Sequence, residues 1–211
     1  MPRSQRDVSL GVTDERFPEG LHLCHIFNDD EERGRTIARY FQQGLKEGER
    51  ALCLMDSISP VEVRAHLAEL GIDVSALDRQ FSIADSQQMY CPTGTFFPDQ
   101  LLDNFGAFCR QAHDEGFSGT RISGDMGWAL RTGTRVEELL VYEAKVKTYL
   151  ETCPATAVCE YDARKFDGSV ILDVLSVHPA MIVRGQIVKN PYYVEPADYL
   201  ARYRARHTPS A

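Results

Sequence analysis

A short stretch near the start of the chain carries three side chains that could bind a metal or an organic ligand. The stretch HLCHIF, residues 22–27, holds His22, Cys24 and His25 among residues typical of a buried strand. Because alternate residues of a strand face the same side, His22 and Cys24 share one face and His25 lies on the other. Only His22 and Cys24 can therefore converge on one ligand.

The surrounding sequence favours a core position or a small-molecule pocket over a metal site. A transition metal needs three or four nitrogen, sulfur or oxygen ligands, and the sequence has no second close-spaced cluster of such residues. A buried histidine that is hydrogen-bonded, or that lines a pocket, needs no further ligands. We therefore expect no metal and no other cofactor.

The stretch GTRISGDMGWAL, residues 119–130, places an arginine inside a predicted strand. Asp125 follows at the end of this strand, and the only tryptophan, Trp128, comes just behind. A buried Arg121 guanidinium needs a carboxylate partner, which Glu143 or Asp125 could supply. The pattern predicts either an internal ion pair between a helix and the sheet, or a ligand site at the carboxyl end of a central strand, where open α/β sheets bind ligands.

A second cysteine lies in VCEYDARKF, residues 158–166, where Cys159 and Tyr161 share one strand face. A cysteine nucleophile needs a neighbouring base that lowers its pKa, and His22 or His178 could supply one. The spacing does not require such a pair. The sequence also lacks the G-x-S-x-G, H-E-x-x-H and G-x-G-x-x-G motifs, so we expect a protein that is not an enzyme.

These residues must be positioned by a fold in which short apolar runs alternate with longer amphipathic ones. This alternation is typical of a parallel sheet flanked by helices. Strands are predicted at residues 22–27, 50–56, 80–86, 119–125 and 155–162, and helices at residues 30–44, 59–71, 99–116, 134–152 and 169–178. Residues 89–99 predict a loop, and Arg184–Gly185 predicts the turn of a β-hairpin. The fold class is therefore α/β, with a mainly parallel central sheet and a C-terminal β-hairpin.

Composition excludes several classes of protein. The chain has 211 residues, enough for one well-packed domain. Its net charge of -8 argues against direct nucleic-acid binding, which depends on lysine and arginine. No apolar run reaches the length of a signal peptide core or a membrane span, so we expect a cytoplasmic protein. The six cysteines form no C-x-x-C pair and are expected to be free thiols.

The loop after the first predicted strand disfavours nucleotide binding. A phosphate cradle needs glycines and a lysine, whereas the loop NDDEERG, residues 28–34, offers four carboxylates that would repel phosphate. These acidic residues do suit the N-terminus of a helix, because its dipole favours negative charge.

The order of seven stretches resembles a known family, the DcmR-type sensory domain, also called the MEDS domain, of methanogens, methylotrophs and many other bacteria. The stretches run from about residue 22 to about residue 196. They are HLCHIF, FQQGLKEGERALCLMD with the later ELGIDV, YCPTGTFFPD, EGFSGTRISGDMGWALR, YEAK, CEYDARKF and LSVHPAMIVRGQIVKNPYYVEP.

This resemblance implies a ligand-sensing domain on a RecA/KaiC-like three-layer core that has lost its phosphate loop. Family members are thought to sense small organic compounds, such as hydrocarbon derivatives. The resemblance also implies a set of ligand-binding residues, which falls here on His22, Cys24, Tyr90, Arg121, Asp125, Trp128, Tyr142, Glu143, Cys159, Tyr161, His178 and Asn190. Asp125 stands where the resemblance leads us to expect glutamate. The aspartate side chain is shorter, so its carboxylate would reach less far toward a ligand.

The resemblance further implies how the chain is divided. We expect a flexible leader at residues 1–20, the sensory domain at residues 21–196 and a basic tail at residues 197–211. The leader is too short for a helix-turn-helix. Output would therefore pass through a signalling partner, such as a kinase or a transcription regulator, or through a homo-oligomer, or else this chain is a fragment of a longer one. Two alternatives remain open: an interaction scaffold without a ligand, and a degenerate nucleotide-binding enzyme.

Overall fold

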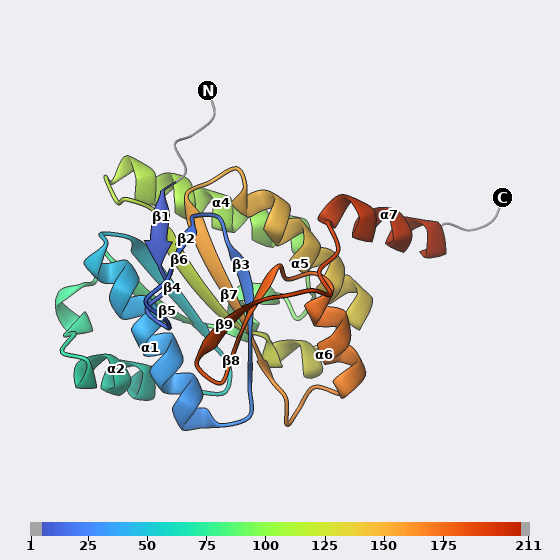
Figure 1. Ribbon diagram of the computed structural model, residues 1–211. Helices are drawn as coiled ribbons and strands as arrows, with labels where there is room; N and C mark the ends of the chain where they lie inside the picture. Colours follow the sequence, from blue (N-terminus) through green and yellow to red (C-terminus); the bar gives the residue numbers. More distant parts are fainter. Residues whose placement is uncertain (1–5, 208–211) are drawn as a thin grey trace.

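The computed structural model describes residues 6–207 and is built around a seven-stranded sheet with the strand order β5-β4-β6-β7-β3-β8-β9 (Figure 1). Every neighbouring pair of strands is parallel except β8 and β9. The strands are β3 (His22–Phe27), β4 (Arg50–Met55), β5 (Phe81–Asp85), β6 (Thr120–Asp125), β7 (Ala155–Asp162), β8 (Ala180–Val183) and β9 (Gln186–Lys189). This arrangement confirms the predicted α/β fold.

Helices cover both faces of the sheet, so the fold has three layers (Figure 1). Helices α1 and α2 pack on one face, and α4, α5 and α6 pack on the other. The helices are α1 (Asp30–Lys46), α2 (Pro60–Glu69), α3 (Ser86–Tyr90), α4 (Pro98–Asp114), α5 (Val136–Leu150), α6 (Gly168–Leu175) and α7 (Pro196–His207), with short 3-10 helices η1 (Val74–Ala76) and η2 (Met126–Leu130).

The alternation of side chains along β3 divides its residues between two cores. Leu23 packs in the core beneath α1, whereas Cys24 packs in the core beneath α5. His22 also lies on the α5 side, because it contacts Glu143 of that helix. His25 lies on the α1 side near Arg33. The predicted assignment of His22 and Cys24 to one face, and of His25 to the other, is therefore confirmed.

Helix α2 begins and ends where the sequence predicts. Ser59 is its N-cap, and the Ser59 and Glu62 side chains form a reciprocal capping box. Pro60 occupies the first helical position, where its missing N–H costs no hydrogen bond. The chain then leaves the helix at Gly71, whose φ of 79° lies in the left-handed region.

The expected flexible leader is instead part of the fold over its described residues. Strands β1 (Asp7–Ser9) and β2 (Arg16–Pro18) form a small antiparallel sheet. Val8 and Leu10 are fully buried and pack in the core beneath α1. Val8 and Leu10 anchor this segment to the core. A pattern of two apolar residues is too brief for the sequence to predict a strand there. Residues 1–5 lie outside the described residues.

Two further expectations need correction. The predicted loop at residues 89–99 begins inside helix α3, which Asp85 caps by accepting a hydrogen bond from the Gln88 N–H. The expected basic tail forms helix α7 over residues 196–207 and packs on α5, with Tyr199 and Leu200 against the core. Residues 208–211 lie outside the described residues.

The predicted hairpin is confirmed. Strands β8 and β9 pair antiparallel around Arg184 and Gly185, whose φ angles are 48° and 67°. Two positive φ angles in a two-residue loop are typical of a type I′ turn, which matches the twist of the strands. Within residues 6–207, no helix combines the length and the apolar character that a membrane crossing requires.

Candidate functional site

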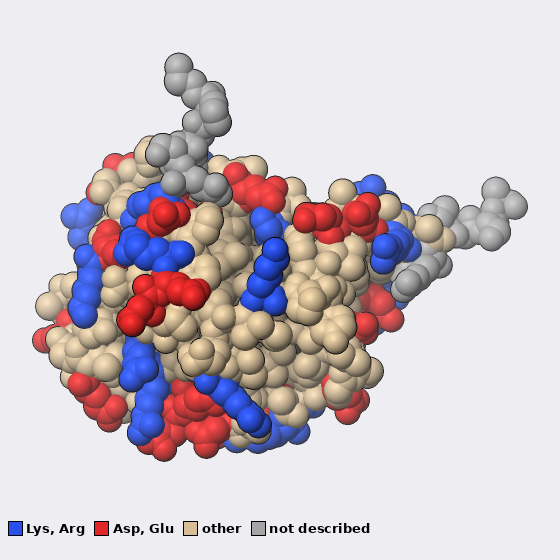
Figure 2. Space-filling model, in the orientation of Figure 1, with Lys and Arg blue, Asp and Glu red and all other residues tan. Residues whose placement is uncertain are grey.

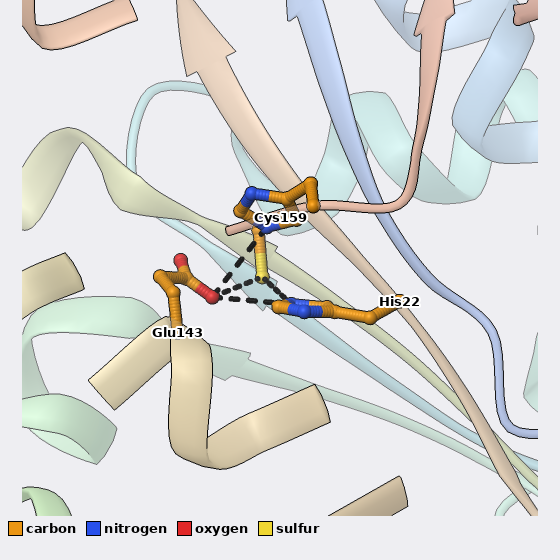
Figure 3. Close-up of side chains that lie close together, drawn as sticks. His22, Glu143 and Cys159 are labelled. Carbon is orange, nitrogen blue, oxygen red and sulfur yellow. Dashed lines mark hydrogen bonds and ion pairs between the residues drawn. The ribbon is translucent and has the colours of Figure 1, made fainter. Parts of the chain in front are cut away.

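A cluster of four polar side chains lies buried between the sheet and α5. His22 comes from β3, Glu143 from α5, Cys159 from β7 and His178 from the loop between α6 and β8. The four potential ligand atoms all lie within 4.8 Å of one another, and all four residues are buried. Figure 3 shows Glu143 reaching from its helix toward His22 and Cys159. We call these four residues the buried cluster.

One oxygen of Glu143 is the centre of the buried cluster. Glu143 Oε2 lies 3.1 Å from His22 Nε2 and 3.6 Å from His178 Nε2. The Cys159 thiol donates a hydrogen bond to the same oxygen at 3.3 Å, and its sulfur lies 3.4 Å from His22 Nε2. Three side chains from separate elements therefore converge on one carboxylate oxygen.

Outer contacts hold the members of the buried cluster in place. The Tyr161 hydroxyl donates to Glu143 Oε1, the oxygen that the cluster leaves free. His178 Nδ1 lies 2.8 Å from the carbonyl oxygen of Val174, so Nδ1 carries the proton in a neutral ring. The Nε2 lone pair of His178 then points toward the carboxylate, and this nitrogen has no hydrogen-bond partner among the described residues.

Burial decides the protonation of these groups. It lowers the pKa of His22 to about 4, so this ring is neutral at neutral pH. Burial acts to raise the pKa of Glu143, but the neighbouring rings of His178 and His22 outweigh it and hold this pKa below its usual range. Burial and the Glu143 carboxylate raise the pKa of the Cys159 thiol well above its ordinary value. At neutral pH the buried cluster therefore holds the Glu143 carboxylate beside a neutral His22 ring and a protonated Cys159 thiol.

The raised pKa argues against a thiolate nucleophile in this state, because the thiolate is the reactive form of cysteine. The donor types are instead those of a transition-metal site, with two imidazoles, a carboxylate and a thiol. The sequence contains no second close-spaced cluster of ligand residues, but the fold brings three distant ones to His22. The partners come from α5, β7 and the loop before β8, so no close-spaced sequence motif could reveal them.

Three aromatic side chains, Tyr90, Trp128 and Tyr142, adjoin the buried cluster, and we call them the aromatic group. Trp128 stacks on Tyr90, with ring centroids 4.7 Å apart, and Tyr142 meets Tyr90 edge to face at 5.9 Å. A cavity of about 20 Å³ lies among Tyr90, Tyr142 and Cys159. Cys159 therefore belongs to both the buried cluster and the wall of this cavity, and the structure brings together predicted residues that lie far apart in the sequence.

Two predicted site residues lie beside these groups and bind backbone. The Cys24 thiol points to the carbonyl oxygen of Ala180, at 3.9 Å, rather than into the buried cluster. The Asn190 side chain donates to the carbonyl oxygens of Leu175 and His178, so it positions the loop that carries His178.

Comparison with known proteins identifies the family of the chain. Residues 21–179 match the family described as MEDS, the methanogen/methylotroph, DcmR sensory domain. The chain belongs to the MEDS family. This match confirms the family resemblance, and the MEDS match contains every member of the buried cluster and the aromatic group.

One known protein is similar to the MEDS chain in sequence, and another is similar to it in fold. The "Transcriptional repressor DcmR" of Methylorubrum extorquens (strain DSM 6343 / CIP 106787 / DM4) is 28% identical over 158 residues, covering 74% of this chain and 57% of that protein. The chain thus spans little more than half the length of this relative. The crystal structure of the KaiC-like protein PH0186 from Pyrococcus horikoshii OT3 matches with a TM-score of 0.59 and 14% identity, covering 84% of this chain and 79% of that one. This likeness shows a KaiC-like fold alone.

Arg121 lies on the opposite face of the MEDS sheet from the buried cluster. Its guanidinium is fully buried and pairs with Glu49, and it also donates to the Tyr40 carbonyl oxygen at 2.7 Å. The expected partners Glu143 and Asp125 were therefore wrong. Glu49 precedes β4, which lies beside β6, so the pair forms through a strand neighbour that the sequence does not specify.

Asp125 also lies on the α1 side, where it belongs to an ion-pair network that sequence reasoning missed. Arg33 of α1 donates to Asp125 at 2.8 Å and to Glu160 at 2.6 Å. Ser57 donates to the same Asp125 oxygen through both its backbone N–H and its hydroxyl. The sequence did contain a signal for this network. Arg33 lies four residues before Ile37, so both residues fall on the buried side of α1.

The predicted location at the carboxyl ends of the strands also needs correction for the buried cluster. His22 is the first residue of β3, and Cys159 pairs with Cys24 in the middle of the neighbouring strands. Asp125 does lie at the carboxyl end of its strand, but on the other face, where it pairs with Arg33 of α1.

Proposed function

We propose that this MEDS domain is a cytoplasmic, non-enzymatic sensory domain that binds a small organic ligand beside the buried cluster and signals through a partner protein. The observation that carries this proposal is the junction of polar and apolar surface at Cys159. On one side of this residue lie polar groups of the buried cluster, and on the other lie Tyr90 and Tyr142. Ligand pockets combine an apolar wall with a few convergent polar groups in this way.

The size of the cavity constrains the ligand. A cavity of about 20 Å³ has room for roughly one water molecule. A larger compound must displace a side chain from the wall of the cavity, and this displacement would couple binding to a change of conformation. Two wider hollows of about 360 Å³ and 340 Å³ lie at the surface, and none of the predicted ligand-binding residues lines them.

The N-terminus of α1 supports a sensory role over nucleotide hydrolysis. In KaiC-like folds this helix end is where a phosphate would bind. Here the Asp29 side chain occupies it as the N-cap and accepts from the Glu32 N–H. Asp30 follows and pairs with Arg164. Phosphate would therefore meet two carboxylates at the place where it needs free N–H donors.

Helix α5 offers a route from the ligand to a partner. It carries Tyr142, a member of the aromatic group, and Glu143, a member of the buried cluster. Helix α7 packs against it (Figure 1). A shift of α5 would move α7 at the surface. We propose a protein partner, either a kinase, a transcription regulator or a second copy of the chain. On the face drawn in Figure 2, basic and acidic side chains are interspersed, which suits such a partner better than nucleic acid.

The sensing proposal is tested by thermal unfolding of the full chain, treated with a chelator, in the presence of small alcohols, aldehydes and halogenated alkanes. A bound compound raises the melting temperature, because it stabilises the native state. Ala157 lines the cavity, so Ala157→Val should fill the space and abolish the shift. Ala51→Val, at a buried position of the core beneath α1, is the matched control and should keep it.

A compound that stabilises both variants equally would show that binding occurs elsewhere. If no compound of the panel stabilises the protein, and native mass spectrometry of the purified chain finds no organic adduct, the sensing proposal fails. The interaction scaffold would then be the better explanation.

A further inference from the structure

We propose that His22, Glu143, Cys159 and His178 form a binding site for one divalent transition metal ion of the zinc class. This inference goes beyond the sensing function and does not depend on it. The donor set of two imidazole nitrogens, one carboxylate oxygen and one sulfur is typical of zinc proteins. Each donor comes from a different element, so the fold assembles the site only when the sheet and α5 are packed together.

Four of the six distances between the donors are close to the edges of a tetrahedron around such an ion, and all six are within 4.8 Å. Zinc lies about 2.0 Å from nitrogen and about 2.3 Å from sulfur, which places tetrahedral ligand atoms about 3.3–3.6 Å apart. Here His22 Nε2 lies 3.1 Å from Glu143 Oε2 and 3.4 Å from Cys159 Sγ. Glu143 Oε2 lies 3.3 Å from Cys159 Sγ and 3.6 Å from His178 Nε2. Small shifts of side chains would complete the coordination.

The contacts around the buried cluster are those that surround metal ligands. A histidine that binds a metal usually donates its other N–H to a carbonyl or carboxylate, and this contact orients the ring. His178 meets this description, since its Nδ1 faces the Val174 carbonyl oxygen and leaves Nε2 for an ion. The Tyr161 hydroxyl binds the outer oxygen of Glu143 and so aims the inner one.

A cation would also satisfy an atom that the described structure leaves without a partner. His178 Nε2 is fully buried and makes no hydrogen bond to any described residue. It lies 3.6 Å from Glu143 Oε2, which is too far for a hydrogen bond. A buried polar atom without a partner is unfavourable, because it does not recover the hydrogen bonds it made to water. An ion between this nitrogen and Glu143 Oε2 would bind both.

The charges of the site add to zero when the metal binds. On binding, the S–H bond of Cys159 breaks, its proton passes to solvent and a metal–sulfur bond forms, with no change of oxidation state. The thiolate and the Glu143 carboxylate carry two negative charges, which a divalent ion balances, while the two imidazoles stay neutral. A neutral site avoids the cost of an unpaired buried charge.

The test uses the full chain, unfolded with denaturant and chelator and then refolded with Zn²⁺ or Co²⁺, so that the ion need not enter a closed interior. We expect one ion per chain by elemental analysis after dialysis. With Co²⁺ we expect a thiolate-to-cobalt charge-transfer band and the intense visible bands of tetrahedral cobalt. Tyr161→Phe should weaken metal affinity about 10-fold to 100-fold, because Tyr161 orients a ligand.

Two cysteine variants provide the matched comparison. Cys159→Ala should lose the charge-transfer band and bind the ion more weakly, whereas Cys24→Ala should keep both the band and the affinity. Cys24 lies opposite Cys159 on the neighbouring strand and is also buried, but its thiol faces the Ala180 carbonyl oxygen and is not one of the four donors. If Cys159→Ala does not refold, as judged by circular dichroism, His178→Gln takes its place and should lower the affinity by the same reasoning.

The metal proposal is overturned if the refolded wild-type chain holds no stoichiometric ion, or if the cobalt spectrum is the same without Cys159. These readouts contain no organic compound, so they cannot be confused with the sensing experiment. Stabilisation by an organic compound in chelated protein would uphold sensing alone, and metal uptake without any such stabilisation would uphold the metal site alone.

Discussion

Cys24 and Cys159 lie opposite each other on the adjacent parallel strands β3 and β7, but their thiols meet different partners. Cys24 Sγ faces the Ala180 carbonyl oxygen, and Cys159 Sγ faces the Glu143 carboxylate. Burial is the main cause that raises the pKa of both thiols above the ordinary value. Both should therefore be inert to reagents that attack the thiolate.

The first prediction concerns the order of thiol labelling. With chelator and iodoacetamide at neutral pH, we expect Cys153, which is partly exposed, to be alkylated before Cys24 and Cys159. The two buried thiols should react only after denaturant unfolds the chain. Peptide mapping by mass spectrometry gives the order, and rapid labelling of Cys159 in the native protein would contradict the packed interior.

The second prediction compares two arginines of α1. Arg33→Met leaves Asp125 and Glu160 buried without their cation, so we expect a loss of about 3–5 kcal/mol in the free energy of unfolding. Arg35, two residues away, pairs with Glu31 at the surface, so Arg35→Met should cost less than about 1 kcal/mol. Urea denaturation of both variants measures the difference, and equal losses would show that the buried network adds no stability.

The third prediction concerns a close approach at Gly44. A Cβ there would lie 2.5 Å from Arg121 Nε and 2.8 Å from Glu49 Oε2. Gly44→Ala should therefore destabilise the protein by about 1–3 kcal/mol through overpacking, although alanine favours a helix. Gly168→Ala is the control, because a Cβ at Gly168 meets no atom within 4 Å. That variant should be neutral or gain up to about 1 kcal/mol, and thermal unfolding ranks the pair.

The fourth prediction is a pH dependence caused by His25. Burial and Arg33 lower the pKa of His25 from 6.5 to about 3, and both ring nitrogens lack hydrogen-bond partners among the described residues. The unfolded chain therefore takes up a proton at a higher pH than the folded chain does. The contribution of neutral His25 is complete above pH 6.5 and is lost as the pH falls toward 3.

Between pH 7 and pH 5, this loss amounts to about 2 kcal/mol for His25. His22, whose pKa falls to about 4, adds a similar loss over the same interval. We expect His25→Leu to reduce the total loss by about half, as measured by urea denaturation at the two pH values with chelator present. An unchanged pH dependence would mean that His25 is solvated in the native state.

Local patterns predicted much of the fold because they depend on near neighbours in the chain. The alternation in HLCHIF assigned His22 and His25 to opposite faces, and Ser59 with Pro60 predicted the start of α2. Such features need no knowledge of which strands lie side by side.

The partners of the buried polar residues depend on strand order, which the local patterns do not contain. His22 meets His178 because β8 lies beside β3, and Arg121 meets Glu49 because β4 lies beside β6. Before the order is known, several carboxylates are equally suitable partners. The family resemblance named all four members of the buried cluster, but not which of them touch.

The buried cluster is closed to solvent, and this closure sets the time scale on which molecules could exchange with it. His22, Glu143 and His178 have no exposed surface, and Cys159 has 4%. Anything that enters or leaves must wait for the sheet and α5 to separate locally, so the exchange rate follows the frequency of that opening rather than diffusion. With the ligand or ion that we propose, a domain sealed in this way would respond slowly and stay occupied after the external concentration has fallen, so it would record average exposure over time.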